Sequence, residues 1–394
     1  MTDPVVIVSA VRTPMGGFLG DLAALPAAEL GAVAIRAALE RAALDPEAVD
    51  EVIMGNVLGA GQGQAPARQA GLGAGLPQSV GCTTVNKMCG SGMKSAMLAH
   101  DLLVAGTNRV MVAGGMESMS NAPYLLPKAR GGMRLGHGEI KDHMFLDGLE
   151  DAYDKGRLMG SFAEECATQY RFTREAQDRF AITSLERAQA AIRDGTFAAE
   201  IAPVEVRDAK TARTVSQDEQ PLKANLARIP SLRPAFRKDG TITPANASSI
   251  SDGAAALVLM RASEAERRGL RPLARIVAHA THARAPGWFT TAPVGAIRTL
   301  FEKTGWCAAD VDLFEINEAF AVVTMAAMHD LALPHAQVNV HGGACALGHP
   351  IGASGARILV TLLAALEKHR LDRGVAALCI GGGEATAMAV ERMH

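Results

Sequence analysis

Short apolar runs alternate with amphipathic segments along the first 120 residues of the chain. The runs at 5–9, 52–54, 82–85 and 110–113 predict strands, and the segments at 27–43, 66–73 and 90–105 predict helices. Strands that alternate with helices are typical of an α/β fold whose sheet is covered on both faces. We expect the last of these strands to end at the glycine pair 114–115.

The C-terminal third of the chain repeats this plan. Its strand-like runs lie at 311–316, 337–340 and 375–380, and its helical segments lie at 294–303, 317–328 and 355–368. The string Met111–Glu117 resembles Leu378–Glu384, and the helix–strand unit 30–54 resembles the unit 294–316. Because the order and spacing of several elements agree, we predict two duplicated α/β halves.

Residues 121–247 do not follow this plan. They hold a charged helical segment, turns of glycine and basic residues, and prolines that break regular structure, so we interpret them as an inserted loop domain. The predicted units are 1–120 plus 248–271 for the N-terminal half, 121–247 for the insertion, and 272–394 for the C-terminal half. Such an insertion would cover a ligand site at the carboxyl edge of the sheet.

Composition and charge exclude several classes of function. The net charge of the 394 residues is −2, which argues against a nucleic-acid partner. No run of about 18 apolar residues suggests a membrane span, and no secretory signal is visible before the first strand. The six cysteines are scattered without a CxxC pair, which favours free thiols. We therefore expect a cytoplasmic protein with neither nucleic acid nor membrane as a partner.

Cys89 lies in the string Asn86–Met93, between a predicted strand and a glycine-rich helix start. Unpaired backbone N–H groups at a helix N-terminus stabilise a thiolate, so we expect a lowered pKa for this cysteine. The glycines that follow permit the close approach of an acyl carbonyl. Unreactive buried cysteines are also common in proteins, so this motif alone leaves that alternative open.

Two further glycine-rich strings carry candidate reactive groups. His349 lies in the loop 342–355, where Pro350 keeps it out of helical geometry, and a histidine fixed in this way suits proton transfer. The loop lacks the Gly-Lys-Ser/Thr ending of a phosphate-binding P-loop. Cys379 ends an apolar strand before three glycines and is a candidate acid/base, with a structural core cysteine as the alternative.

Asn317 stands where a strand is predicted to yield to a helix. It suits the N-cap of that helix, and its amide could instead hold a water that donates to an oxyanion. No metal site is expected. The pair His279 and His282 and the pair His335 and His341 lack a convincing set of carboxylate or thiol partners.

Taken together, these strings resemble the thiolase family from about residue 5 to residue 391, in the family's order. The strings that carry the resemblance are Asn86–Gly92, Ala113–Ser118, Leu232–Phe236, Asn246–Ser248, Asp252–Ala256, Asn317–Phe320, Gly348–Pro350 and Cys379–Gly383. The resemblance implies the thiolase fold, in which two duplicated α/β halves form a layered αβαβα core and carry an inserted loop domain. It also implies acyl transfer between coenzyme A thioesters.

The resemblance assigns roles to single residues. It implies that Cys89 takes the acyl group, that His349 is its base, and that Cys379 is the second acid/base. Asn317 would hold the water of one oxyanion hole, and the backbone N–H groups of Cys89 and Gly381 would form the other. This inventory suits a Claisen condensation, which needs a covalent acyl carrier, two oxyanion sites and a base at the α-carbon.

Further residues are implied on the substrate side. By family position, the residues that contact pantetheine or the acyl group are Ser248, Met159, Phe236, Ala319, Phe320, Leu158 and Phe289. Leu158 stands where acetoacetyl-CoA-specific members commonly carry histidine. Many family members carry a glycine-containing string where this chain has Phe289–Pro293. Both departures leave the acyl chain length open. Lys223 and Arg228 could meet the phosphates of coenzyme A, with solvated surface as the alternative.

The resemblance implies an acetyl-CoA C-acetyltransferase, which reversibly condenses two acetyl-CoA into acetoacetyl-CoA and coenzyme A. The alternatives are a broader-chain 3-ketoacyl-CoA thiolase of fatty-acid degradation and, more distantly, a non-catalytic acyl-CoA or lipid-binding protein on the same fold. We expect no permanently bound cofactor, because coenzyme A thioesters are substrate and product. The family also implies a homo-oligomer, a dimer or a tetramer, with Arg130–Lys155 as a contact loop.

Overall fold

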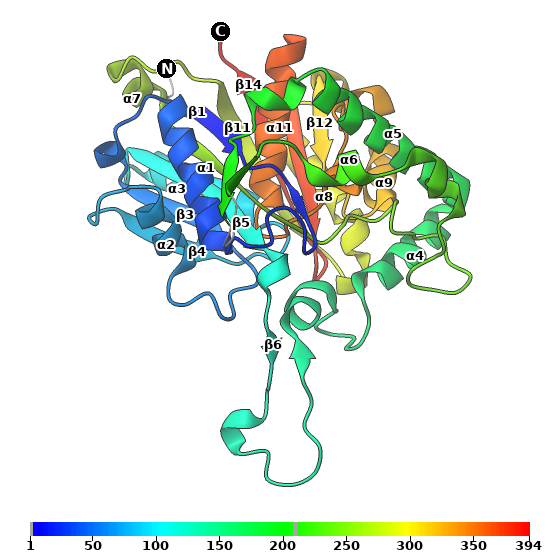
Figure 1. Cartoon of the computed structure of the whole chain (residues 1–394). Coiled ribbons are helices and arrows are strands. Elements are labelled where there is room, and N and C mark those ends of the chain that lie inside the picture. The colour runs from blue at the N-terminus through cyan, green and yellow to red at the C-terminus, as the bar shows by residue number, and fades with distance from the viewer. Residues whose placement is uncertain (1–2, 208–211) are drawn as a thin grey trace.

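The computed structural model describes residues 3–207 and 212–394, and its centre is a large mixed β-sheet covered by helices (Figure 1). Among the described residues this sheet has ten strands, in the order β12-β13-β14-β11-β1-β10-β5-β3-β4, with β2 paired to β10. The strands are β1 (Val5–Arg12), β2 (Gly16–Gly17), β3 (Glu51–Gly55), β4 (Gly81–Val85), β5 (Val110–Ser118), β10 (Ser251–Arg261), β11 (Ala274–Ala283), β12 (Leu313–Ile316), β13 (Arg373–Ile380) and β14 (Glu384–Arg392).

The helices lie on the faces of the sheet and in the insertion. They are α1 (Ala27–Arg41), α2 (Pro66–Gly73), α3 (Ser91–Ala105), α4 (Met159–Tyr170), α5 (Arg174–Arg193), α6 (Glu219–Lys223), α7 (Ala262–Arg267), α8 (Ala292–Thr304), α9 (Ala321–Leu331), α10 (Ala344–Leu347) and α11 (Ser354–His369). Two small hairpins pair β6 (Tyr124–Leu125) with β7 (Lys141–Asp142), and β8 (Val204–Arg207) with β9 (Ala212–Val215). Across the described residues, every helix is too short or too polar to span a membrane.

The strand order repeats in the two halves of the sheet. From the centre outward, the first half runs β1-β10-β5-β3 and the second runs β11-β14-β13-β12. In each half the outermost of these pairs is parallel and the other two are antiparallel. The halves join where Val6 and Ile7 of β1 pair with Arg275 and Ala274 of β11. This repeat confirms the predicted duplication.

Alternating side chains along the strands separate three hydrophobic cores. In β10, Val258 and Met260 pack with α1 and α2, whereas Leu257 and Leu259 point to the opposite face and pack with α3 and α11. The same alternation in β14 directs one set of side chains to α8 and the other to α3 and α11. The resulting layers are helices, one half of the sheet, the helices α3 and α11, the other half of the sheet, and helices again.

The two middle helices begin side by side. Gly92, in the first turn of α3, lies against the backbone of Gly352, Ala353 and Ala356 at the start of α11. Both helices therefore present their N-terminal ends, which carry partial positive charge, to the same region of the molecule. Any reactive group in the loops that precede these helices is brought to this region.

The insertion packs on both halves and also carries a projecting hairpin. Phe162 and Ala163 of α4 share a hydrophobic core with Val322 and Val323 of α9. The hairpin of β6 and β7 extends away from the layered core (Figure 1). The unit boundaries that we drew from the sequence remain a prediction.

Three predicted elements differ from the structure. β5 does not end at Gly114 but runs straight on to Ser118, because it pairs with β10 along that whole length. Residues 337–340 are not a strand. There the backbone pairs with β12 only at one bridge, between Val338 and Phe314. Beyond this bridge the side-chain amide of Asn339 exchanges two hydrogen bonds of 2.8 Å with the backbone of Ile316, in place of further strand pairing.

The third difference concerns the start of α9. We predicted a helix from Asn317, and the structure begins it at Ala321 with Phe320 as the N-cap residue. The backbone N–H of Asn317 donates to the carbonyl of Ala377 at 3.0 Å, so it continues the pairing of β12 with β13. The interpretation of Asn317 as a helix N-cap is therefore wrong.

Candidate active site

A cavity of about 360 Å³ lies where α3 and α11 begin, and it brings together Cys89, His349, Cys379 and Gly381. These residues come from three separate stretches of the chain, and the sequence singled out each of them. The other predicted residues that line the cavity are Leu158, Met159, Phe236, Ser248, Phe289, Ala319 and Phe320. The lining residues that we did not predict are Phe145, Gly148, Leu149, Gly160, Ala235, Thr243, Pro244, Ala247, Ser249, Ile250 and Ile351.

Cys89 stands in a tight turn between β4 and α3. Met88, the residue before it, has a φ of 48°, in the left-handed region that non-glycine residues rarely adopt. The turn is held by Asn86, whose Oδ1 accepts the N–H of Met88 at 2.9 Å, and by Ser91, whose Oγ accepts the N–H of Lys87 at 2.8 Å. Cys89 is half-buried on the cavity wall, so its thiol is open to a ligand.

Glycine at position 90 lets the two cysteine-bearing segments approach each other. A Cβ placed on Gly90 would overlap Cδ1 of Ile380, the residue that follows Cys379 in β13. A larger residue would have to displace the side chain of Ile380, next to Cys379. The glycine after Cys89 therefore permits the close spacing of the two segments that carry the thiols.

The pKa of Cys89 departs from our expectation. Burial in the cavity wall raises the pKa of the thiol, and the backbone N–H groups of Gly381 and Cys89 lower it by a smaller amount. The predicted stabilisation by nearby N–H groups is present, but desolvation is the larger effect. In the free protein Cys89 is therefore a neutral thiol, and it needs a base.

His349 is fixed by its backbone in the loop between α10 and α11. Its N–H donates to the carbonyl of Ser249 at 3.1 Å and to Oγ of Ser251 at 3.2 Å. Gly348, just before it, has a φ of 100°, and a Cβ at this position would also overlap Oγ of Ser251. This glycine lets the backbone bring the imidazole into the cavity.

The hydrogen bonds around His349 assign its tautomer. Oγ of Ser354 lies 2.5 Å from Nδ1 of His349 and donates its single hydrogen to the carbonyl of Pro350 at 2.9 Å. Toward the imidazole the hydroxyl then accepts, so we assign the proton to Nδ1; the amide of Asn317, 3.4 Å from the same nitrogen, then makes no hydrogen bond to it. Nε2 is buried without a protein partner and keeps a free lone pair. Ser354 lies within a motif that we singled out, but its sequence position gave no sign of this contact.

The imidazole of His349 is kept neutral. Burial lowers its pKa to about 3, and the positive charge of Arg357 adds to this effect. Arg357 is itself buried 3.5 Å from the carboxylate of Glu315, whose pKa burial raises to about 8. A neutral imidazole with a free Nε2 is the form that can accept a proton from a thiol.

Cys379 is the more deeply buried of the two cavity thiols, with an exposed fraction of 1%. Burial raises its pKa well above the usual value, and the negative charge of an ionised Cys89 raises it further. The ionisation of the two thiols is therefore coupled, and a negative charge on one disfavours a negative charge on the other. Each suits a role in a different half of a reaction.

Asn317 lies behind His349 and not on the cavity wall. Its Nδ2 is 3.4 Å from Nδ1 of His349, and its Oδ1 accepts a hydrogen bond from Arg357 at 3.3 Å. Asn317 therefore contacts the histidine directly. Its predicted role as the residue that holds an oxyanion water stays a prediction.

Lys223 and Arg228 lie away from the cavity wall. Lys223 is exposed and forms an ion pair with Glu219, one turn earlier in α6. Arg228 is exposed in the short helical segment Leu226–Ser231. The structure places both on the surface, and a contact with the phosphates of coenzyme A stays a prediction.

Comparison with known proteins agrees with this geometry. The family model "Thiolase, N-terminal domain" matches residues 5–263, and "Thiolase, C-terminal domain" matches residues 270–392. The chain belongs to the thiolase family. The predicted thiolase fold is thereby confirmed, with its duplicated halves and layered core.

Relatives in the thiolase family match along their whole length. The chain is 52% identical over 391 residues to the acetyl-CoA acetyltransferase of Escherichia coli, which covers 99% of both chains. It is 49% identical over 391 residues to that of Schizosaccharomyces pombe, again with 99% of both covered. Among solved structures, the Acat5 thiolase of Ascaris suum in complex with coenzyme A has a TM-score of 0.94 and 42% identity, covering 99% of this chain and 100% of that one.

Proposed function

We propose that this protein is an acetyl-CoA C-acetyltransferase that joins two acetyl-CoA into acetoacetyl-CoA and coenzyme A, reversibly and by ping-pong kinetics. The observation that carries the proposal is the shared cavity of Cys89, His349 and Cys379. Named relatives in bacteria and yeast, at about half identity over the full length, support the choice of acetyl-CoA as substrate.

The first half-reaction acylates Cys89. Nε2 of His349 accepts the thiol proton, and the sulfur attacks the thioester carbonyl of acetyl-CoA to form a new carbon–sulfur bond. The bond to the sulfur of coenzyme A breaks, and the departing thiolate takes the proton back from His349. The low pKa of His349 suits this cycle, because an imidazolium at that site returns its proton readily.

The second half-reaction forms the carbon–carbon bond. Cys379 first gives its thiol proton to Nε2 of His349 and, as the thiolate, removes a proton from the α-carbon of a second acetyl-CoA; the resulting enolate attacks the carbonyl carried by Cys89. The bond between that carbonyl and Cys89 breaks, acetoacetyl-CoA leaves, and the thiolate of Cys89 takes the proton held by His349, so that both thiols are neutral again. The mutual effect of the two thiols on their pKa values fits this alternation.

Two sites on the cavity wall suit the developing oxyanions. The backbone N–H groups of Cys89 and Gly381 lower the pKa of the Cys89 thiol, so they favour negative charge at this place. At the other site His349 donates once its Nε2 is protonated, and Asn317, which lies behind it, would hold a water that completes the donor pair. Coenzyme A thioesters are the substrate and product, and the proposed steps use no permanently bound cofactor.

One observation favours the broader-chain alternative, a 3-ketoacyl-CoA thiolase. The cavity wall around Leu158 is apolar, with Leu149, Phe236 and Phe289 among its members. Such a wall would accept a longer acyl chain than a wall that carries a histidine. The names of the relatives favour the short substrate, so we place the broader enzyme second. A non-catalytic lipid-binding protein comes last, because all three reactive groups are present.

Thiolysis rates separate these candidates. We expect kcat/KM for acetoacetyl-CoA to exceed that for 3-ketooctanoyl-CoA, and incubation with acetyl-CoA alone to yield acetoacetyl-CoA. A higher kcat/KM for the longer substrate would favour the broader thiolase. Binding of coenzyme A thioesters without turnover of any of them would favour the non-catalytic alternative.

We also propose self-association through the projecting hairpin. Leu135 is 97% exposed, and Tyr124, Ile140 and Tyr153 are each at least two-thirds exposed, within or beside the predicted contact loop Arg130–Lys155. Apolar side chains at such exposure favour burial against a second copy. Light scattering of the whole chain should give a dimer or tetramer, and Leu135→Asp should lower the mass. The six free thiols suit a reducing compartment, and we infer the cytoplasm.

A further inference from the structure

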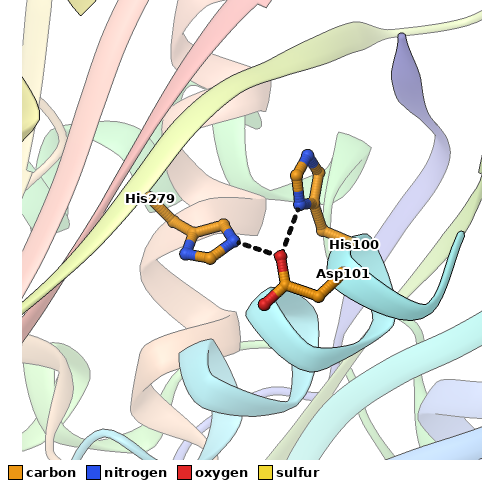
Figure 2. A group of neighbouring side chains, drawn as sticks. All are labelled: His100, Asp101 and His279. Atoms are coloured by element: carbon orange, nitrogen blue, oxygen red, sulfur yellow. Dashed lines mark hydrogen bonds and ion pairs between the residues drawn. The ribbon is translucent and has the colours of Figure 1, made fainter. Parts of the chain in front are cut away.

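Three potential metal ligands meet at a point that the proposed reaction does not use. His100 and Asp101 lie in the second half of α3, and His279 lies on β11 of the other half of the molecule. Figure 2 shows both imidazole rings directed at one carboxylate oxygen of Asp101. This cluster is toward the end of α3 opposite to Cys89, and it shares no residue with the cavity.

The distances are close to those of a metal site. Oδ1 of Asp101 lies 2.9 Å from Nε2 of His279 and 3.1 Å from Nδ1 of His100. One ligand atom of each residue lies within 4.8 Å of the ligand atoms of the other two. Bonds of about 2.0–2.2 Å in tetrahedral geometry set two donors roughly 3.3–3.6 Å apart, so small side-chain rotations suffice.

We propose that His100, Asp101 and His279 bind one divalent transition-metal ion of the zinc class, with solvent in the remaining position. Two imidazoles and a single carboxylate suit zinc, cobalt or nickel, whereas calcium and magnesium prefer sites built from oxygen alone. Solvent can reach the ion, because the side chain of Asp101 is 55% exposed.

The cluster is partly preorganised for this ion. The side chains of His100 and His279 are only 18% and 16% exposed, and their rings stand nearly perpendicular with centroids 5.0 Å apart. Because α3 belongs to the first half and β11 to the second, the bound ion would join the two halves. We therefore assign it a stabilising role, at a distance from the reacting groups.

One neighbouring charge opposes the ion. Nζ of Lys303 donates to the backbone carbonyl of His279 at 2.9 Å, which brings a positive charge close to the ligands. The negative charge of Asp101 and the positive charge of Lys303 cancel, so the surroundings of the ion carry no net negative charge. Removing the ammonium should therefore strengthen metal binding, whereas removing a ligand should weaken it.

Cobalt binding to the intact, metal-free protein tests the proposal. The thiols are first alkylated with iodoacetamide, so that cysteine cannot bind the ion. We expect one cobalt per chain, with a visible absorption band of nitrogen and oxygen ligation, and a rise of Tm when zinc is added. Loss of a group that only orients a metal ligand costs about 10- to 100-fold in affinity, so His279→Gln should cost at least about 100-fold.

The matched control is His329→Gln. His329 and Asp330 are likewise neighbours at the end of a helix, with Nδ1 and Oδ1 2.9 Å apart, and they do not belong to the cluster. Its cobalt affinity should equal that of the wild type, whereas Lys303→Met should bind more tightly. Far-ultraviolet circular dichroism and thiolysis activity should be unchanged in all three variants. Absence of saturable binding, equal affinity in His279→Gln, or weaker binding in Lys303→Met would each overturn the proposal.

Discussion

Oγ of Ser354 lies 2.5 Å from Nδ1 of His349, at the first turn of the central helix α11. This contact holds the proton of the imidazole on Nδ1 and leaves Nε2, which has no protein partner, with a free lone pair. A net hydrogen bond is worth about 0.5–1.5 kcal/mol, so Ser354→Ala should lower kcat by roughly 2- to 12-fold. The rate of acylation of Cys89, measured by rapid quench with acetyl-CoA, should fall by the same factor.

Ser95→Ala is the matched control for that substitution. Oγ of Ser95 is equally buried, in the other central helix, and lies 2.7 Å from the carbonyl oxygen of Gly92 and 2.6 Å from that of Gly114, so its one hydrogen has an acceptor there. This variant should lose stability with little change in kcat, because its hydroxyl does not touch His349. Equal losses of kcat in both variants would show that Ser354 acts only through packing.

The contact between Gly90 and Ile380 makes a second prediction. Overpacking costs about 1–3 kcal/mol, so Gly90→Ala should lower kcat/KM by about tenfold or more through displacement of Cys379. Ile380→Val removes the overlapping Cδ1 and should restore part of that loss. The double-mutant cycle for kcat/KM measures the coupling, which we expect at about 0.5–3 kcal/mol. Additive effects of the two substitutions would contradict the proposed spacing role.

The sequence predicted the helices that cover the sheet and six of its ten strands, because apolar runs and helical periodicity reveal elements without knowledge of their neighbours. It did not predict the strands β2, β10, β11 and β14. The wrong predictions came where a tertiary contact decided the outcome. Asn339 replaces a strand edge with its side-chain amide, and Asn317 stays extended because its N–H bonds to Ala377 across the sheet.

The residues of the candidate site were likewise predicted where a local string reveals them and missed where a tertiary contact does. Cys89, His349 and Cys379 were found because each stands in a distinctive glycine-rich string. Ser354 was missed because a serine at a helix start is commonplace, and only the folded loop turns it toward His349. The cluster of Asp101 and His279 was missed because 178 residues separate its members in sequence. The pKa of Cys89 is raised and not lowered, because the thiol is buried, and a local motif does not show burial.

Stability should fall in acid because of buried neutral histidines. Burial, with neighbouring positive charges, lowers the pKa of His341 from 6.5 to about 4. Between these values the unfolded chain binds the proton more tightly, so the free energy of unfolding decreases as the pH falls from 6.5 to 4. His341→Gln should reduce this slope near pH 5 by about 1.4 kcal/mol per pH unit. Urea unfolding at several pH values measures the slope.

The control for this pH effect is His329→Gln. The side chain of His329 is 67% exposed, so its removal should leave the slope unchanged. A slope in His341→Gln equal to that of the wild type would contradict the assignment of a buried neutral imidazole.

Leu158 should control the acyl chain length. It lines the apolar wall of the cavity, so Leu158→His should make that wall more polar. Pocket changes of this size are worth about 1–3 kcal/mol, so the kcat/KM ratio of acetoacetyl-CoA to 3-ketooctanoyl-CoA should rise by about tenfold or more. Leu222→His, at an exposed position of α6, should leave that ratio unchanged. A ratio that falls in Leu158→His would contradict this role.

The division of labour between the two cavity thiols is tested most directly by the mass of the Cys89 peptide after incubation with acetyl-CoA. In Cys379→Ala we expect the peptide to gain one acetyl group while no acetoacetyl-CoA appears, because acylation needs Cys89 and His349 alone. Cys89→Ala should show neither the adduct nor the product. Normal turnover in Cys89→Ala, or an acetyl group found on Cys379 in place of Cys89, would contradict the proposed mechanism.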